Sequence, residues 1–145
     1  MELENLIQAV ADSLFVELEA SGRHVHVTKE QSMALFGHLL TPKRPLSQPG
    51  QFLAQERVTV IGPKGEFRDV AVLGPERGEG QVEISLTDAR ALGIDAPVRL
   101  SGDIHNTPGA ELVGERGRVR LLRGVIAAKR HIHMTSQAAR RFGVK

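Results

Sequence analysis

The sequence predicts a mainly β protein, a small barrel with a few short helices, and three observations indicate this fold class. Short runs rich in Val, Leu and Ile recur along the chain, and Gly and Pro residues separate them. Aromatic residues make up only 3% of the 145 residues, so the core has to be built from aliphatic side chains. The length allows one domain or two very small ones, and no apolar run approaches the roughly 20 residues of a membrane span.

The start of the chain has the apolar spacing of an amphipathic helix. Apolar positions recur every three or four residues and share one face; they are Leu3, Leu6, Ile7, Val10 and Leu14. Such a face either packs on the core of the protein or serves as a partner-docking or shell-targeting peptide. The segment lacks the basic start and long apolar stretch of a signal peptide, which favours a cytoplasmic protein.

The middle of the chain is predicted to form strands connected by tight turns. Residues 58–60 and 70–73 are β-type runs joined through the turn sequence Gly62–Gly65, which predicts a hairpin. Residues 81–86 predict another strand. Further strands are expected at 97–101, 111–113, 119–122 and 125–128.

Two other segments of the middle region differ from this pattern. Thr87 can cap a short helix that Gly93 ends. Residues 40–52 contain three prolines and predict an irregular loop that is long enough to carry a function.

An internal repeat carries the most specific information in this sequence. Residues Arg23–Thr28 return as Arg130–Thr135, with the arginine, both histidines and the threonine identical and the intervening positions apolar. Each copy is followed by a helix-like stretch that ends in Phe-Gly, at residues 36–37 and 142–143. Duplicated units generally pack about a pseudo-twofold axis, and such an axis can bring the two motifs together.

Each copy of His-x-His has the form of half a metal site. In an extended backbone residues i and i+2 point to the same side, so His24 and His26 project together, as do His131 and His133. Imidazole nitrogens are common zinc ligands, and in a chain without Cys a metal must be held by His and carboxylate. A single His-x-His is equally well explained as a chance surface pair, but the duplication favours a metal site.

Glu83 is the strongest candidate for a carboxylate ligand. It alternates with two apolar neighbours in a predicted strand, where an unpaired buried charge would be costly. The alternative is an outward-facing strand carboxylate. Arg23, Arg77 and Arg130 are candidates for phosphate binding because a guanidinium matches phosphate oxygens in bidentate fashion, although each is also typical of a solvated surface charge.

A cupin metal site is a rival interpretation of the first motif. His24, His26 and Glu30 have its His-x-His-x3-Glu spacing. The second copy has Gln137 at the matching place, however, and Leu18 stands where the cupin motif requires glycine. These two departures weigh against a cupin.

Charge and composition narrow the classes of partner. The 19 basic and 17 acidic residues leave a net charge of +2, which is too mild to identify a nucleic-acid binder. The only aromatic side chains of the Phe, Tyr and Trp type are five Phe residues, and this scarcity excludes an aromatic stacking platform for single-stranded nucleic acid. This balance is compatible with a local basic site for a phosphorylated ligand.

The chain contains four ordered motifs, Ser21–Val27, Leu46–Phe52, Gln81–Arg90 and Ala128–Met134. Together they closely resemble the PduL-type phosphotransacylases, also called phosphate propanoyltransferases, and the resemblance runs from about Leu3 to Lys145. It implies a mainly β fold with duplicated small antiparallel β-barrels, short capping α-helices and a two-zinc site between the barrels.

The resemblance also implies roles for single residues. The metal-ligand positions of the family are matched by His24, His26, Glu83, His131 and His133. Arg77 matches its phosphate-contacting arginine, and Ser21 lies at a position near bound coenzyme A. We therefore expect two zinc ions in the complete protein and coenzyme A as a substrate.

The implied reaction moves a short acyl group between coenzyme A and inorganic phosphate, without a covalent acyl-enzyme. The expected partners are acyl-CoA and phosphate, with no nucleic acid and no membrane. Members of the family work in bacterial microcompartments or free in the cytosol. The expected location is therefore cytoplasmic, with microcompartment association as the alternative.

The repeat spacing predicts an incomplete second half. The two copies are offset by 107 residues, whereas 14 residues follow His131. The family continues for several strands beyond this point and supplies another metal-binding histidine there. The resulting domain prediction is residues 1–20 as N-terminal helix and lead-in, 21–122 as first β-barrel and 123–145 as start of the second, incomplete barrel.

An incomplete barrel has consequences for activity and association. Because an open sheet edge tends to pair with another chain, we expect a homo-oligomer or a missing C-terminal segment as a partner, and low acyl transfer from these residues alone. Two other functions fit the same ligands: a non-catalytic zinc-binding barrel, and a metal-dependent hydrolase in which water replaces phosphate.

Overall fold

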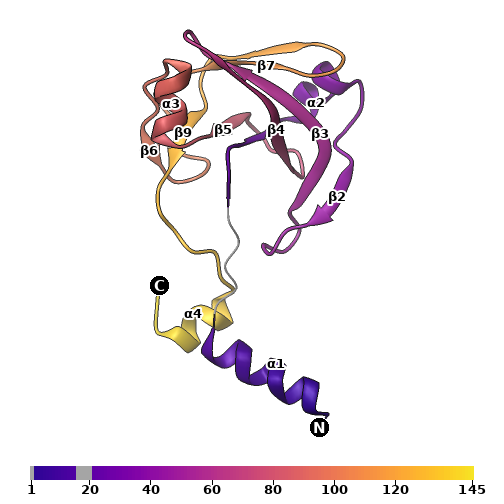
Figure 1. Ribbon diagram of the computed structural model, residues 1–145, viewed down its shortest axis with the longest axis vertical. Coiled ribbons are helices and arrows are strands. Elements are labelled where there is room, and N and C mark those ends of the chain that lie inside the picture. The colour runs from indigo at the N-terminus through magenta and orange to yellow at the C-terminus, as the bar shows by residue number, and fades with distance from the viewer. Residues whose placement is uncertain (1, 16–20) are drawn as a thin grey trace. The chain divides into compact units, whose positions relative to one another are not determined.

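The computed structural model describes residues 2–15 and 21–145, and the chain divides into two compact units. One unit is Ser21–Arg130, which contains all the strands of the described residues; the other combines Met1–Ala20 with His131–Lys145 (Figure 1). Among residues 2–15 and 21–145, no helix combines the length and apolar character needed to cross a membrane.

The second unit contributes two helices. Helix α1 spans Leu3–Leu14 and confirms the predicted N-terminal helix. Helix α4 spans Ser136–Phe142 and confirms the helix predicted after the second motif. The side chain of Thr135 caps α4 by accepting a hydrogen bond from the Ala138 N–H at 3.1 Å, and Gly143 ends it at a φ of 67°.

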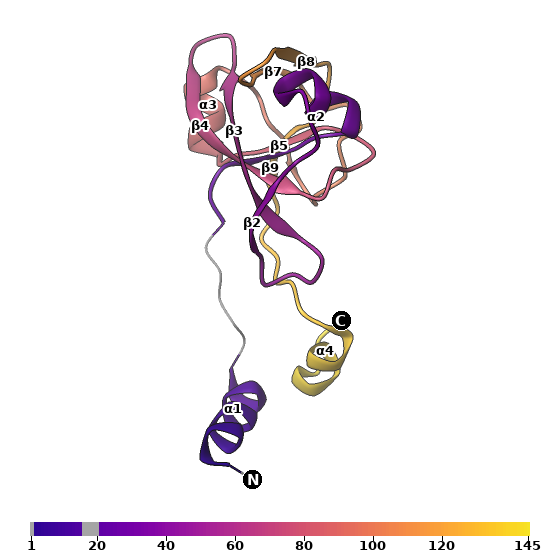
Figure 2. The same cartoon turned by 90° about the vertical axis from the view of Figure 1, so that its right-hand side faces the viewer.

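The strands of Ser21–Arg130 form one curled, nine-stranded sheet, which confirms the mainly β prediction (Figures 1 and 2). The strands are β1 His24–His26, β2 Pro42–Pro45, β3 Phe52–Ile61, β4 Glu66–Gly74, β5 Gln81–Glu83, β6 Val98–Arg99, β7 Ala110–Val113, β8 Arg118–Leu121 and β9 Val125–Ala128. Their order is β6-β9-β5-β1-β4-β3-β7-β8, and β2 pairs with β3. Strand β1, which carries the first His-x-His motif, therefore lies near the middle of the sheet.

The sheet is mixed, which corrects the expectation of purely antiparallel pairing. Strands β1 and β4 are parallel, as are β5 and β9, and β6 and β9. Parallel neighbours need a crossover connection, whereas a hairpin suffices for antiparallel ones. Between β1 and β4 this crossover consists of a helix and the strands β2 and β3.

The predicted hairpin is confirmed as β3 and β4, which pair from Phe52 to Gly74 at one end and from Ile61 to Glu66 at the other. The predicted loop at 40–52 is wrong in part, because β2 forms within it and pairs with β3. Proline lacks the N–H that a central strand needs, but β2 tolerates two prolines because β3 is its pairing partner on one side.

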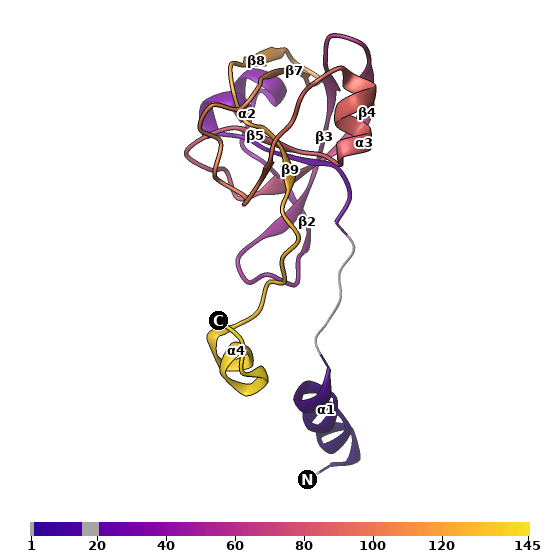
Figure 3. The ribbon, with the colours of Figure 1, turned by 90° about the vertical axis from the view of Figure 1, so that its left-hand side faces the viewer.

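Helix α2 spans Lys29–Phe36 and follows β1 directly. Thr28 and Gln31 form a capping box: the Thr28 hydroxyl accepts from the Gln31 N–H at 3.1 Å, and the Gln31 side chain accepts from the Thr28 N–H at 2.9 Å. Gly37, at a φ of 80°, ends the helix, as the Phe-Gly sequence predicts. Figures 2 and 3 show α2 beside β7 and β8.

Helix α3 spans Leu86–Leu92, and its predicted cap is wrong by two residues. Ser85, rather than Thr87, accepts a hydrogen bond from the Asp88 N–H at 3.0 Å. Strand β5 is correspondingly shorter than predicted, because the chain turns into the helix at this serine. Gly93 ends α3 at a φ of 72°, as predicted.

The core is aliphatic, as the composition predicts. The most completely buried large side chains are Leu35, Leu92, Leu112, Ile126, Val25, Val27, Val58, Val60, Val70, Val72, Val82 and Val125. Val25 is the middle residue of β1 and Val82 the middle residue of β5, so both strands are anchored in this core. Their outer residues consequently point to the opposite face of the sheet.

Candidate metal centre

The pairing of β1 with β5 gathers polar side chains on one face of the sheet. His24 lies directly opposite Glu83, and His26 lies opposite Gln81. Directly paired residues share a face, and so do residues two apart in one strand. All four residues are buried, with exposed fractions of 7%, 7%, 3% and 2% in the order named.

Three of the predicted ligands converge on this face. The Nε2 atom of His24 lies 3.4 Å from Oε2 of Glu83, and Nε2 of His26 lies 3.7 Å from Oε1. The two imidazole rings are perpendicular, with centroids 5.0 Å apart. One ligand atom from each residue lies within 4.8 Å of the other two, which is a spacing that a single metal ion can bridge.

The hydrogen bond of His24 and the burial of His26 both suit metal binding. His24 donates from Nδ1 to the Gly22 carbonyl at 2.9 Å, an arrangement that leaves the Nε2 lone pair facing Glu83. Burial lowers the pKa of His26, so its ring is neutral at neutral pH. Neutral imidazole is the form that ligates metals.

The charge of Glu83 completes the donor set. Burial by itself would raise the pKa of Glu83, but its close approach to the imidazoles of His24 and His26 outweighs burial, and the pKa lies well below its usual range. Glu83 is therefore a carboxylate at neutral pH. Two imidazoles and one carboxylate are ligands that zinc accepts, so the residues present fit such an ion.

Arg77 lies beside this cluster. Its backbone N–H donates to the Val27 carbonyl at 2.8 Å, which places it at the end of β1. Its Nη1 atom donates to the Ser101 hydroxyl at 3.0 Å. Burial lowers the pKa of Arg77, but a guanidinium stays protonated at neutral pH. A pocket of about 230 Å³ adjoins it, lined by Arg77, Gly78, Glu79, Gln81, Gly102 and Ile104.

Sequence reasoning missed two residues of this site. Gln81 precedes Glu83 by two positions in a strand, so the alternation of side chains places it on the same face. That signal was present in the sequence. Ser101 comes from the segment after β6, and no local pattern predicts that it reaches Arg77.

Arg23, one of the candidates for phosphate binding, is paired with a carboxylate in the structure. Its Nε and Nη2 atoms donate to the two carboxylate oxygens of Asp88, at 3.0 and 2.8 Å. Its guanidinium also lies 4.0 Å from the centroid of the Phe67 ring. The arginine of the first motif therefore ties β1 to α3 and to β4.

The remaining predicted site residues lie outside the cluster of His24, His26 and Glu83. Ser21 is exposed at the start of that unit. Glu30, the ligand that a cupin site requires, is exposed in the first turn of α2. His131 and His133 belong to the other unit, where their Nε2 atoms are 2.9 Å apart and their rings are nearly perpendicular.

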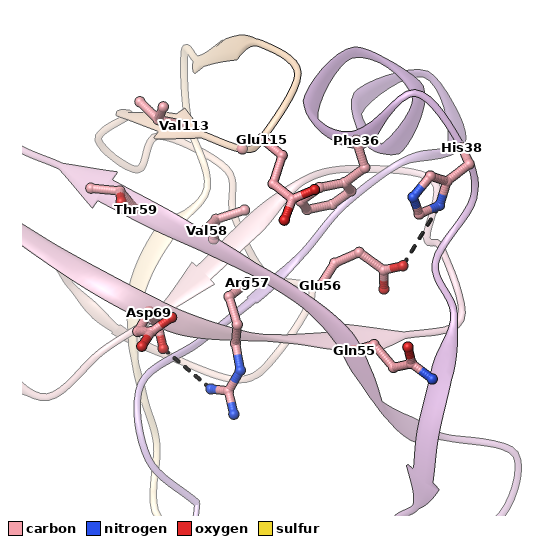
Figure 4. A pocket seen from close by; sticks show the side chains of 11 residues that line it. Phe36, His38, Gln55, Glu56, Arg57, Val58, Thr59, Asp69, Val113 and Glu115 are labelled. Atoms are coloured by element: carbon pink, nitrogen blue, oxygen red, sulfur yellow. Dashed lines mark hydrogen bonds and ion pairs between the residues drawn. The ribbon is translucent and has the colours of Figure 1, made fainter.

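A second, larger pocket of about 570 Å³ contains none of the predicted site residues. It is lined by Phe36, His38, Gln55, Glu56, Arg57, Val58, Thr59, Asp69, Val113, Gly114 and Glu115 (Figure 4). Within it, Nδ1 of His38 lies 3.6 Å from Oε1 of Glu56, and Arg57 donates to the Asp69 carbonyl at 3.2 Å. Of its ionisable side chains, His38 and Glu56 thus lie close together, and Arg57 contacts the backbone of β4.

The fold and the cluster together define a mainly β protein with a candidate metal centre next to an arginine. The sequence model of the phosphate propanoyltransferase family matches residues 17–145. The chain therefore belongs to the phosphate propanoyltransferase family, and by its name this is a family of acyltransferase enzymes.

Individual relatives agree with this assignment. The chain is 56% identical to a phosphate propanoyltransferase of Leptotrichia buccalis, over 99% of this chain and 69% of the relative. It is 54% identical to one of Enterococcus faecalis, over 95% of this chain and 66% of the relative. It is 49% identical to one of Clostridioides difficile, over 98% and 69%. The chain thus spans about two thirds of the length of these relatives.

Proposed function

We propose that this chain carries a phosphate acyltransferase site, at which a short acyl group passes from coenzyme A to inorganic phosphate. The observation that supports this most strongly is the cluster of His24, His26 and Glu83 beside Arg77, in a chain of this family. A phosphate oxygen forms a bond to the thioester carbonyl carbon, and the carbon–sulfur bond breaks. Coenzyme A leaves as a thiolate, which takes a proton from solvent.

Each residue of the cluster has a defined task in this proposal. His24, His26 and Glu83 would hold zinc, whose positive charge would orient phosphate and polarise the thioester carbonyl. Arg77 binds phosphate through charge-assisted hydrogen bonds, because the Ser101 hydroxyl to which it donates is neutral and does not compensate its charge. Burial of the cluster lowers the local dielectric and strengthens these interactions.

The other site residues keep the roles that the resemblance implies. His131 and His133 are proposed as ligands of a second zinc ion, and Ser21 as a contact of coenzyme A. The proposed substrates are acyl-CoA and phosphate. Cytoplasmic or microcompartment location, self-association and the domain boundary at residue 122 stay predictions.

The proposal is tested by measuring acyl phosphate formation from propanoyl-CoA and phosphate in the presence of zinc. Because the relatives are longer than their match, the assay uses the 145-residue chain and a fusion that adds the unmatched residues of the Leptotrichia buccalis relative. We expect Arg77→Ala to raise the KM for phosphate, since the lost bonds are worth roughly 1.5–3 kcal/mol. Arg68→Ala, which removes an exposed arginine from β4, is the matched control.

Three results would contradict the proposal. Release of coenzyme A that needs water and not phosphate would indicate the hydrolase. Zinc binding without any turnover of the fusion would indicate the non-catalytic barrel. A change in the KM for coenzyme A alone would show that Arg77 does not bind phosphate.

A further inference from the structure

Two neutral side chains, Gln81 and Ser101, connect the two charged groups of the candidate site. The Nε2 atom of Gln81 donates to Oε1 of Glu83 at 2.6 Å and to the Ser101 hydroxyl at 3.0 Å. The same hydroxyl accepts from Nη1 of Arg77 at 3.0 Å. We call Gln81 and Ser101 the Gln81–Ser101 bridge; it runs from the carboxylate to the guanidinium.

The orientation of the Gln81 amide is fixed by its third partner. Its Oε1 atom accepts from the Gly102 N–H at 2.6 Å, and a backbone N–H can only donate. The nitrogen of the amide therefore has to face Glu83 and Ser101, where both of its hydrogens are used. With an exposed fraction of 2%, Gln81 is almost completely buried, so its polar atoms depend on these protein partners.

The hydroxyl of Ser101 is the junction between the two ends. It accepts from both Gln81 and Arg77, which uses its two lone pairs. Its own hydrogen is therefore left to donate. The Ser101 hydroxyl is thus bonded to Arg77 directly and linked to Glu83 through Gln81.

A direct ion pair between Arg77 and Glu83 would compensate both charges, but neither group would then be free to bind a metal ion or phosphate. The bridge keeps the two charges apart and orients each of them. It occupies Oε1 of Glu83, while Oε2 faces His24 at 3.4 Å. It also occupies one of the five N–H donors of Arg77 and leaves the positive charge uncompensated by that contact.

We propose that the Gln81–Ser101 bridge is a positioning device that holds Glu83 toward the two imidazoles and Arg77 toward the phosphate. This inference rests on the proposed function, because it assigns a role within that site. Residues that orient a metal ligand through a hydrogen bond typically change metal affinity about 10–100-fold when they are removed. The bridge therefore couples metal affinity to phosphate affinity.

The test measures zinc and phosphate binding by titration calorimetry, independently of turnover. The parent chain carries His131→Ala and His133→Ala, so that the first cluster is measured alone. We expect Gln81→Leu to weaken zinc binding about 10–100-fold. Ser101→Ala is expected to weaken phosphate binding to the zinc-loaded chain about tenfold, and Ser101→Thr, which keeps the hydroxyl, to restore it.

Two controls separate positioning from general destabilisation. Ser32→Ala removes a buried hydroxyl that bonds the His38 carbonyl, and it should change neither affinity. In an Arg77→Ala background, Ser101→Ala should have no further effect on phosphate, because the hydroxyl acts through that arginine. Ser101 is exposed, so its variants remain informative even where Gln81→Leu fails to fold.

The outcomes distinguish this inference from the proposed function. If the parent binds zinc and phosphate and Ser101→Ala binds both equally well, the positioning role is overturned and the proposed function stands. An equal loss of phosphate affinity with and without Arg77 also overturns it. If the parent binds no zinc, the proposed function fails and the inference fails with it.

Discussion

Arg23 and Arg77 show that the partner of a residue, more than its type, decides its role. The guanidinium of Arg23 is matched by both oxygens of Asp88, so its charge is compensated and its geometry is fixed. Arg77 instead donates to the neutral hydroxyl of Ser101. In the proposed function the positive charge of Arg77 binds phosphate, whereas that of Arg23 stabilises the junction of β1 and α3.

Glu56, in the wall of the larger pocket, gives a prediction about pH. Burial alone would raise the pKa of Glu56, but the Thr41 backbone N–H, which donates to both carboxylate oxygens at 3.2 and 3.0 Å, outweighs it and the pKa is lowered. A lowered pKa stabilises the fold above the pKa of the unfolded state, about 4.3. This contribution is lost as the pH falls through the lower, folded value.

We therefore expect Glu56→Gln to lower the free energy of unfolding by about 1 kcal/mol at pH 7 and by less as the pH falls below about 4. Urea unfolding between pH 7 and pH 3 measures this difference. Glu115→Gln removes the same charge from the same pocket without the Thr41 hydrogen bonds, and its effect should not follow this trend. A Glu56→Gln deficit that is constant across the pH range would contradict the account.

At the scale of elements, the sequence repeat is also a repeat of local structure. In both copies the threonine caps the following helix, through Thr28 for α2 and Thr135 for α4, and a left-handed glycine ends it. The histidines differ in conformation. Those of the first copy lie in β1, which pairs with β4 and β5, whereas residues 129–135 are in no strand.

The cap of α2 gives a prediction about stability. Thr28→Ala removes the side-chain half of the capping box, and losses of this kind cost about 1 kcal/mol of stability. Thr28→Ser keeps the hydroxyl and should retain most of the stability. Denaturant unfolding of the two variants beside the natural sequence measures both effects; equal losses from alanine and serine would show that the hydroxyl does not act as a cap.

At the scale of the whole molecule, the features that depend on local sequence patterns were predictable, whereas the long-range pairing of strands was not. The β character, the hairpin of β3 and β4 and the shared face of His24 and His26 follow from side-chain alternation and turn residues, which are local. That Glu83 joins the two histidines depends on the pairing of β1 with β5, and only the family resemblance predicted it. The parallel pairing of β1 with β4 was not predictable, because alternation does not record which strand is the neighbour. Ser101 was missed for the same reason, since a long-range contact brings it to Arg77.

The central claim concerns the first cluster, which lies wholly within Ser21–Arg130 and whose ligands all come from β1 and β5. Anomalous diffraction at the zinc absorption edge, from crystals of the zinc-loaded chain, tests it most directly. The account predicts a peak about 2.0–2.1 Å from Nε2 of both His24 and His26, and at a similar distance from a Glu83 oxygen. Zinc peaks at other residues, with none between β1 and β5, would contradict it.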